Sequence, residues 1–276
     1  MPGKRRNDPD GGIRWPRFAR IVVANVLAWS VHAAAQMPPP ATVAAPGSSA
    51  EADSPPRRAT PAELRRLAEK LGFQRGRFVR EAIGMSLDVP RGQHLLTGSD
   101  ARLADTALRG ESDPYLIGWI VPADKTVTDA NLRIVRLRWR HDGLVAGDAA
   151  ALDPTALLDL VHTKTNMPRL ASSGGTLLGY DVAPVREAST LVWSEERQPD
   201  GSSTRVHDCH ALRLARRGVL EISITGVDAK TAKTCTDELR TIAATVRFEP
   251  DSDYPAQIRG ERLAPYSLAG LITQTQ

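Results

Sequence analysis

The densest group of possible metal ligands and proton carriers in this chain is the run His-Asp-Cys-His at residues 207–210. On a β-strand, alternate side chains point to opposite faces, so His207 and Cys209 would share one face of a sheet. Asp208 and His210 would share the other face. Neither face of this strand supplies the three protein ligands that a zinc site needs, and the usual zinc-ligand spacings are missing. We therefore expect no metal site here and interpret the run as a polar sheet face.

The sequence carries no recognisable catalytic motif. It lacks the nucleophile elbow G-x-S-x-G, the phosphate-binding G-x-x-x-x-G-K-[ST], the dinucleotide-binding G-x-G-x-x-G and the zinc-protease H-E-x-x-H. The adjacent Glu195 and Glu196 would point to opposite faces of a strand, so they cannot act as paired acid and base on one substrate. Catalytic residues are therefore unknown, and no cofactor is expected. If the protein is an enzyme, the candidates for its site are His207, His210 and Glu195.

Arginines and tryptophans on expected strands could line a ligand site. Three of the four arginines in one strand would share a face and could bind an anion, but a solvated face paired to carboxylates is the favoured interpretation. The strand tryptophans could line a ligand groove, but such side chains more often pack in the core or on a sheet face. The arginines are Arg133, Arg136, Arg138 and Arg140, of which the last three share the face, and the tryptophans are Trp119, Trp139 and Trp193.

Cys209 and Cys235 are the two cysteines of the chain. In an oxidising compartment they could form a disulfide, which the chain-entropy model values at about 3–4 kcal/mol. The alternation along the strand argues against it, because Leu212 and Leu214 indicate that even-numbered side chains face the core. Two outcomes stay open at this point: a disulfide helped by a bulge, or two small half-buried side chains.

The net charge of +4 comes from the start of the chain. Residues 1–35 contain six basic and two acidic side chains, out of 36 and 32 in the whole sequence. The other 241 residues therefore carry 30 of each sign and sum to zero. A nucleic-acid-binding protein needs a basic surface that neutralises phosphates, so we expect no nucleic-acid partner.

The first 35 residues have the parts of a secretory signal peptide. A basic segment precedes an apolar run at residues 21–31, and Ala33-Ala34-Ala35 follows it. We predict cleavage before Gln36 and a mature protein that is soluble in the periplasm. The alternative is an uncleaved N-terminal helix in the inner membrane, with residues 21–35 as the membrane attachment. Residues 36–59 are rich in Pro, Ala and Ser and are predicted to be a linker.

Residues 60–276 are predicted to fold as a single globular domain. Helices are expected at residues 60–70, 100–108, 153–164 and 228–244, and strands at residues 78–89, 115–121, 132–139, 177–185, 190–197, 204–215, 219–227 and 246–248. Short turns join the four strands between residues 177 and 227, which predicts an antiparallel meander with helix 228–244 packed across one face. The fold class is therefore α+β, an antiparallel β-meander with flanking helices, and an α/β/α sandwich is one form that it could take.

Several short stretches between residues 75 and 272 form a specific set because of their order and spacing. They are Gly84–Gly92, Asp100-Ala101, Ile117–Pro122, Asp142–Val145, Asp148-Ala149, Tyr180–Trp193, Arg216–Leu220, Val246–Phe248, Tyr254 and Tyr266–Ile272. This set resembles the bacterial family called domain of unknown function 2167, whose members are described as membrane-anchored. The resemblance implies no catalytic residues, and the family's C-terminal membrane helix is expected to be missing here. More distantly, the helix-flanked meander is similar to the α/β/α sandwich of the photosystem accessory protein and Mog1-like group, which implies a fold and no function.

These observations favour an exported cell-envelope protein that is not an enzyme and serves as a binding or accessory module. Its expected partner is an unidentified envelope protein or component. Two alternatives stay open: an envelope hydrolase or other enzyme with an unrecognised site, and a carrier of a small apolar ligand. A pocket that gathers two or more of His207, His210 and Glu195 with shifted pKa values would favour the enzyme. A flat apolar patch would favour the binding module, and a deep apolar cavity would favour the carrier.

Overall fold

Two antiparallel β-sheets form the centre of the described part of the chain. The computed structural model describes residues 57–111, 113–147, 152–163, 174–255 and 260–275. The predicted signal peptide at residues 1–35 lies outside these residues, as does the predicted linker up to residue 56.

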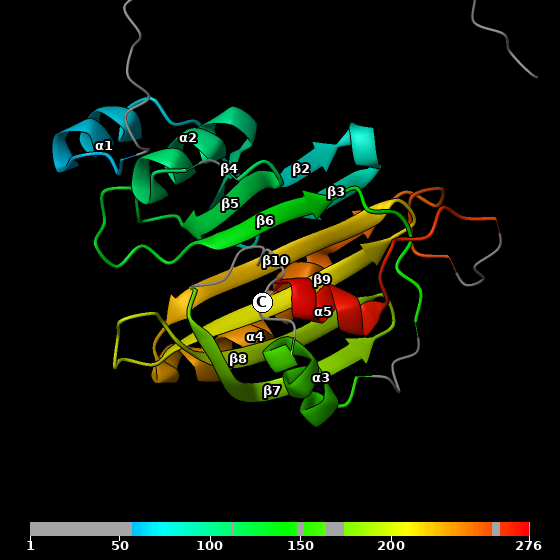
Figure 1. The fold of residues 1–276 in the computed structure, drawn as a ribbon. Helices are drawn as coiled ribbons and strands as arrows, with labels where there is room; N and C mark the ends of the chain where they lie inside the picture. The colour runs from blue at the N-terminus through cyan, green and yellow to red at the C-terminus, as the bar shows by residue number, and fades with distance from the viewer. Residues whose placement is uncertain (1–56, 112, 148–151, 164–173, 256–259, 276) are drawn as a thin grey trace, which may run out of the picture. The chain divides into compact units, whose positions relative to one another are not determined.

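The larger sheet has eight strands in the order β1-β4-β5-β6-β10-β9-β8-β7, and every neighbouring pair is antiparallel (Figure 1). The strands are β1 (Phe73–Gln74), β4 (Gln93–Thr97), β5 (Leu116–Pro122), β6 (Val135–Arg140), β7 (Thr176–Glu187), β8 (Thr190–Gln198), β9 (Val206–Ala215) and β10 (Gly218–Val227). The strands β7 to β10 pair in chain order, so the four-stranded antiparallel meander is confirmed. Two-residue turns join β7 to β8 and β9 to β10, and such short turns place consecutive strands side by side.

Helix α4, Ala229–Thr245, packs across one face of this meander, as the sequence predicts. It begins at Asp228, whose carboxylate accepts a hydrogen bond from the backbone N–H of Thr231 at 2.7 Å. This contact satisfies one of the N–H groups that have no partner within the first helical turn. The buried stripe of the helix faces β9 and β10 and includes Cys235, Leu239 and Ile242.

A three-stranded sheet in the order β11-β3-β2 shares the hydrophobic core of α4. Its strands are β2 (Arg77–Arg80), β3 (Met85–Asp88) and β11 (Val246–Phe248). The sequence predicts one extended segment over residues 78–89, but a 3-10 turn, η1 at Glu81–Ile83, interrupts it. Gly84 follows with φ 59°, a left-handed conformation that glycine adopts at little cost, and the chain reverses there into the β2–β3 hairpin.

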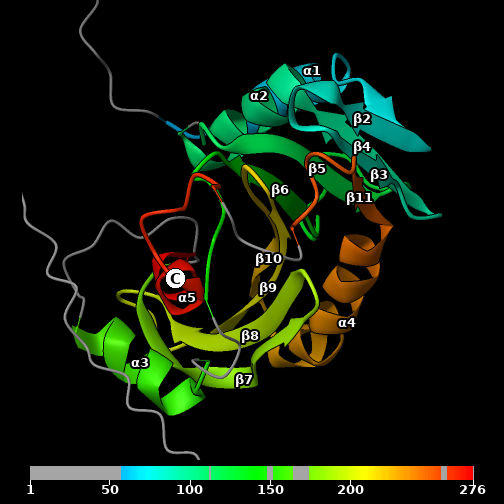
Figure 2. The same cartoon turned by 90° about the vertical axis from the view of Figure 1, so that its right-hand side faces the viewer.

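Helices on both faces of the large sheet give the α/β/α form of the predicted α+β class. Helix α4 covers one face, while α2, α3 and α5 lie on the other, as Figures 1 and 2 show. The bounds are α1 (Pro61–Ala68), α2 (Gly98–Arg109), α3 (Pro154–Thr163) and α5 (Leu268–Thr275). Among the helices in the described ranges, none combines the length and the apolar character needed to cross a membrane.

Both faces of the large sheet are buried, and this corrects the argument about the cysteines. On β9, Cys209 and Ala211 pack towards α4. Leu212 and Leu214 pack towards α5 on the other face. The odd position of Cys209 in the strand therefore does not oppose a disulfide, because both faces of β9 are buried. Cys209 and Cys235 form a disulfide that joins β9 to α4, with Cα atoms 6.2 Å apart.

Candidate functional site

A band of polar and charged side chains lies on the face of the large sheet that α2 and α5 cover. In register, one residue from each of five neighbouring strands forms a row: Trp119, Arg136, Ser223, His210 and Trp193. We call the polar part of this face the polar band, and every member except Asp113 is buried. The polar band comprises Asp105, Asp113, Arg136, Arg138, Glu195, Arg197, Asp208, His210, Glu221 and Ser223.

Carboxylates from α2, from the loop before β5 and from β10 pair with the arginines of β6. Arg136 Nη2 lies 3.1 Å from both Asp105 Oδ2 and Asp113 Oδ2. Arg138 donates from Nε to Asp113 Oδ2 at 2.6 Å and from Nη1 to Glu221 Oε2 at 2.5 Å. The sequence predicted that these arginines lie on a solvated sheet face and pair with carboxylates. The pairing is confirmed, but the face is not solvated, because the Arg136 and Arg138 side chains are 6% and 2% exposed.

Burial and pairing act in opposite directions on these groups. Burial raises the pKa of the Asp105 carboxyl above its ordinary value, against the attraction of Arg136. Burial acts to lower the pKa of Arg138, but attraction from Glu221 and Asp113 raises it overall. Since an arginine pKa starts far above neutrality, these arginines stay charged. Each is a fixed positive charge whose loss would leave a buried carboxylate without its partner.

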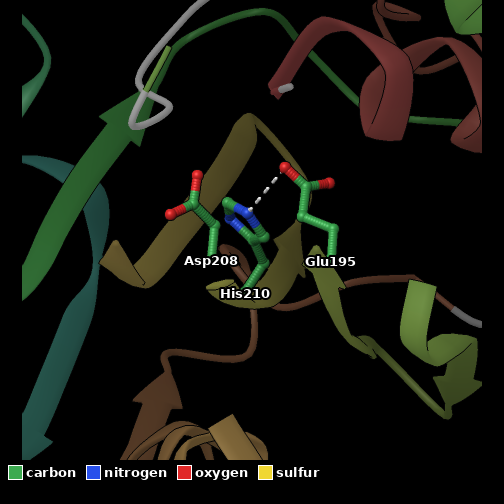
Figure 3. A group of neighbouring side chains, drawn as sticks. All are labelled: Glu195, Asp208 and His210. Atoms are coloured by element: carbon green, nitrogen blue, oxygen red, sulfur yellow. Dashed lines mark ion pairs between the residues drawn. The ribbon is translucent and has the colours of Figure 1, made fainter. Parts of the chain in front are cut away.

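Glu195, Asp208 and His210 meet at the β8–β9 end of the polar band (Figure 3). Glu195 lies opposite Asp208 in the register of β8 and β9, and His210 is two residues further along β9. The imidazole stands between the two carboxylates, with Nε2 3.7 Å from Glu195 Oε1. One ligand-type atom from each side chain lies within 4.8 Å of the other two. All three residues are 0% exposed.

Neighbouring groups fix the orientation of these three side chains. The Trp193 ring stacks on His210, with centroids 4.7 Å apart and planes 19° from parallel. Arg197 Nη1 donates to Glu195 Oε1 at 2.9 Å. The backbone N–H of Gly226 donates to Asp208 Oδ1 at 2.7 Å, from an irregular part of β10 where φ is 72°. A residue with a side chain would be strained at that φ, so glycine suits this contact.

The electrostatic balance of the cluster favours a positive charge between the carboxylates. Burial acts to raise the pKa of Glu195, but His210 and Arg197 outweigh burial and hold this pKa below its ordinary value. Burial acts to lower the pKa of His210, but the interactions with Glu195 and Asp208 outweigh it and raise this pKa. At 3.7 Å the Glu195–His210 contact is longer than a hydrogen bond. Within the described residues, Glu195 Oε2 and both ring nitrogens of His210 have no hydrogen-bond partner.

The structure brings two of the three candidate site residues together and separates the third. His207 lies on the opposite face of β9, with Nδ1 2.7 Å from Asp181 Oδ2. Glu196 also points to that face and pairs with Arg205 at 3.1 Å, so its separation from Glu195 is confirmed.

Glu195 was a candidate for an enzyme site, but it was not counted as a metal ligand, because ligands were counted within the single strand that carries residues 207–210. Glu195 comes from the neighbouring strand, and cross-strand register is set by tertiary pairing. Two charged residues of the polar band, Arg197 and Glu221, were missed. Glu221 had a usable signal, since a carboxylate inside the apolar run of β10 predicts a buried partner. The predicted packing of Trp119, Trp139 and Trp193 in the core or on a sheet face is confirmed, because all three are buried.

A pocket of about 430 Å³ lies at the α2 end of the polar band. Its charged lining is Asp105, Arg109, Arg133, Arg136 and Asp228, and Trp119, Leu132 and Ile224 contribute to its apolar wall. Arg109 and Arg133 have side chains that are each 37% exposed, so the pocket can be reached from solvent. Arginines therefore outnumber carboxylates around a partly apolar opening.

The fold and the site together define an α+β domain with a large antiparallel sheet, covered on both faces, and a buried band of charge. The chain belongs to the family described as Protein of unknown function (DUF2167), which matches residues 77–276. The family resemblance drawn from the sequence is therefore confirmed. No curated protein matches the chain.

Among solved structures, the chain is similar to the solution structure of cyanobacterial PsbP (CyanoP) from Synechocystis sp. PCC 6803. The TM-score is 0.36 and the sequence identity is 12%. The alignment covers 65% of this chain and 94% of that chain.

Proposed function

We propose that this protein is an exported cell-envelope module that binds an anionic, partly apolar group and does not act as an enzyme. The observation that carries the proposal is the contrast between two parts of the polar band. The pocket beside Arg109, Arg133 and Arg136 can be reached from solvent. Glu195 and His210, which could transfer protons, are 0% exposed, and a substrate would have to displace the packed layer above them.

The chemistry of the pocket favours an anion with an apolar part. Arg109 is held loosely, because its contacts with Asp105 and Glu111 are 4.0 Å and 3.9 Å long. Its guanidinium is therefore free to turn towards a carboxylate or phosphate, with which arginine forms paired hydrogen bonds. The partly exposed Leu132 and Val227 in the pocket lining offer apolar contact to the rest of such a ligand.

Export is supported by two independent features. The first is the basic, apolar and small-residue pattern of residues 1–35. The second is the disulfide between Cys209 and Cys235, since disulfides persist in oxidising compartments outside the cytoplasm. The mature chain would begin at Gln36 and reside in the periplasm.

The pocket is tested with 1-anilinonaphthalene-8-sulfonate, a fluorescent probe that joins a sulfonate to aromatic rings. We expect saturable binding that Arg109→Gln weakens about tenfold, the loss expected for one charge-assisted hydrogen bond. Arg205→Gln is the matched control, because Arg205 is 63% exposed and pairs with Glu196 outside the pocket. Equal probe affinity in the two variants, with unchanged circular dichroism, would contradict the proposed pocket.

Export is tested by N-terminal sequencing of the protein recovered from a fractionated native host. We expect the sequence to start at Gln36 and the protein to occur in the soluble periplasmic fraction. An intact Met1 in a carbonate-resistant membrane fraction would indicate an uncleaved anchor instead, and a cytoplasmic location would refute export.

A further inference from the structure

We propose that Glu195, Asp208 and His210 form a binding site for a divalent transition-metal ion, with Zn²⁺ as the expected ion. The site is separate from the pocket beside Arg109 and does not depend on the function proposed for that pocket. It revises the expectation of no metal, which rested on one strand alone.

The three side chains lie close enough together to hold one metal ion. Three atoms that lie within 4.8 Å of one another have a common point within about 2.8 Å of each, close to the 2.0–2.2 Å of zinc bonds to nitrogen and oxygen. Side-chain movements of less than an ångström would therefore bring all three atoms to bonding distance. The side chains project from paired positions on two neighbouring strands, and a sheet is a rigid support for ligands.

The cluster holds buried polar atoms that lack a hydrogen-bond partner among the described residues. Glu195 Oε2 and the two ring nitrogens of His210 are buried and have no hydrogen-bond partner among the described residues. Buried polar groups in folded proteins are normally satisfied, so an exception needs an explanation. A metal ion bonded to one His210 nitrogen and to the Glu195 carboxylate, whose Oε1 faces Nε2 at 3.7 Å, would give the imidazole a partner.

Neighbouring groups orient the three side chains of the cluster. Arg197 donates to Glu195 Oε1 and so orients the Glu195 carboxylate. Gly226 donates to Asp208 Oδ1, and Trp193 holds the plane of the His210 ring. Metal-binding carboxylates are commonly oriented by such outer hydrogen bonds.

The donor set points to the kind of ion. One imidazole and two carboxylates suit Zn²⁺ and Mn²⁺, whereas Ca²⁺ and Mg²⁺ prefer oxygen ligands throughout. Three protein ligands and a fourth position for water would complete a tetrahedral zinc site. Because the cluster is fully buried, the ion would enter during folding or through local opening of the layer above it.

The test measures zinc bound by the full chain. The protein is unfolded, refolded with Zn²⁺ under oxidising conditions, passed through a desalting column and analysed by elemental mass spectrometry. We expect one tightly held Zn²⁺ per chain and a value near zero for Glu195→Gln and His210→Gln. His207→Gln is the matched control, because it alters a histidine of the same strand on the opposite face, and it should keep one Zn²⁺.

A second measurement covers the case in which the variants fail to fold. Wild-type protein refolded with Co²⁺ should show the visible absorption of a four-coordinate cobalt site, and added Zn²⁺ should abolish it. Wild-type protein that folds and retains neither ion would overturn the proposal. Loss of zinc in His207→Gln together with its retention in His210→Gln would place the metal elsewhere and would also overturn it.

Discussion

Individual charges inside the polar band are held in pairs, and each pair depends on both partners. Arg138 contacts Asp113 on one side and Glu221 on the other, with its side chain 2% exposed. Taking such charges out of water is costly, and good geometry offsets much of that cost. Removal of Arg138 would leave Glu221 charged and buried without this partner. The folded protein would then be less stable than with apolar side chains at both positions.

We predict that Arg138→Met lowers the free energy of unfolding by about 3–5 kcal/mol, the range for breaking one side of a buried ion pair. Urea denaturation followed by circular dichroism measures this change. Arg205→Met is the control, because its exposed pair with Glu196 should contribute at most about 1 kcal/mol. The double variant Arg138→Met/Glu221→Leu should regain part of the loss. A cost below that of the control would show that the pairing is not stabilising.

At the scale of elements, the disulfide joins the meander to the helix that packs across it. Cys209 lies in β9, Cys235 lies in α4, and 26 positions separate them in the sequence. In the chain-entropy model, closing a loop of this length restricts the unfolded chain and so favours the folded state. The link also ties α4 to the strand that carries His210 on its other face.

We predict that the double variant Cys209→Ala/Cys235→Ala loses about 3.5 kcal/mol of stability, the value of the chain-entropy model for this loop. Urea denaturation with and without a thiol reductant provides the measurement. The reductant should destabilise the wild-type protein by a similar amount and leave the double variant unchanged. If the reductant affects both proteins equally, the disulfide is not the cause.

At the scale of the whole molecule, the distribution of charge separates the start of the chain from the rest. The excess of four positive charges belongs to residues 1–35, and the remaining sequence is neutral. The arginines of β6, which looked like an anion-binding face, are largely neutralised by buried carboxylates. The arginines of β6 therefore do not form a basic surface patch large enough to bind a nucleic-acid backbone.

We predict that a chain lacking residues 1–35 does not bind duplex DNA measurably in about 0.1 M salt, because it has no excess of positive charge to release counterions. Fluorescence anisotropy with a labelled duplex measures this, and the full chain with its basic N-terminus is the comparison. Micromolar binding by the shortened chain that weakens with salt would contradict the prediction and point to the arginines of the pocket.

Local signals in the sequence determined much of the fold. Short turns and alternating strands predicted the β7–β10 meander, and the helix predicted at residues 228–244 is α4, which packs across that meander. These features depend on neighbours within a few residues along the chain, which the sequence displays directly. The ordered motifs were likewise sufficient to place the chain in its family.

The tertiary structure alone decided which polar groups meet and which are buried. The second covered face of the sheet turned Cys209 into a disulfide partner and removed the β6 arginines from solvent. Strand register placed Glu195 beside Asp208 and His210, as a third ligand-type side chain. The physical reason is that strand register and the covering of a sheet face depend on contacts between residues far apart in sequence. The alternation within one strand therefore shows which side chains share a face, but not which helix covers that face or which strand lies beside it.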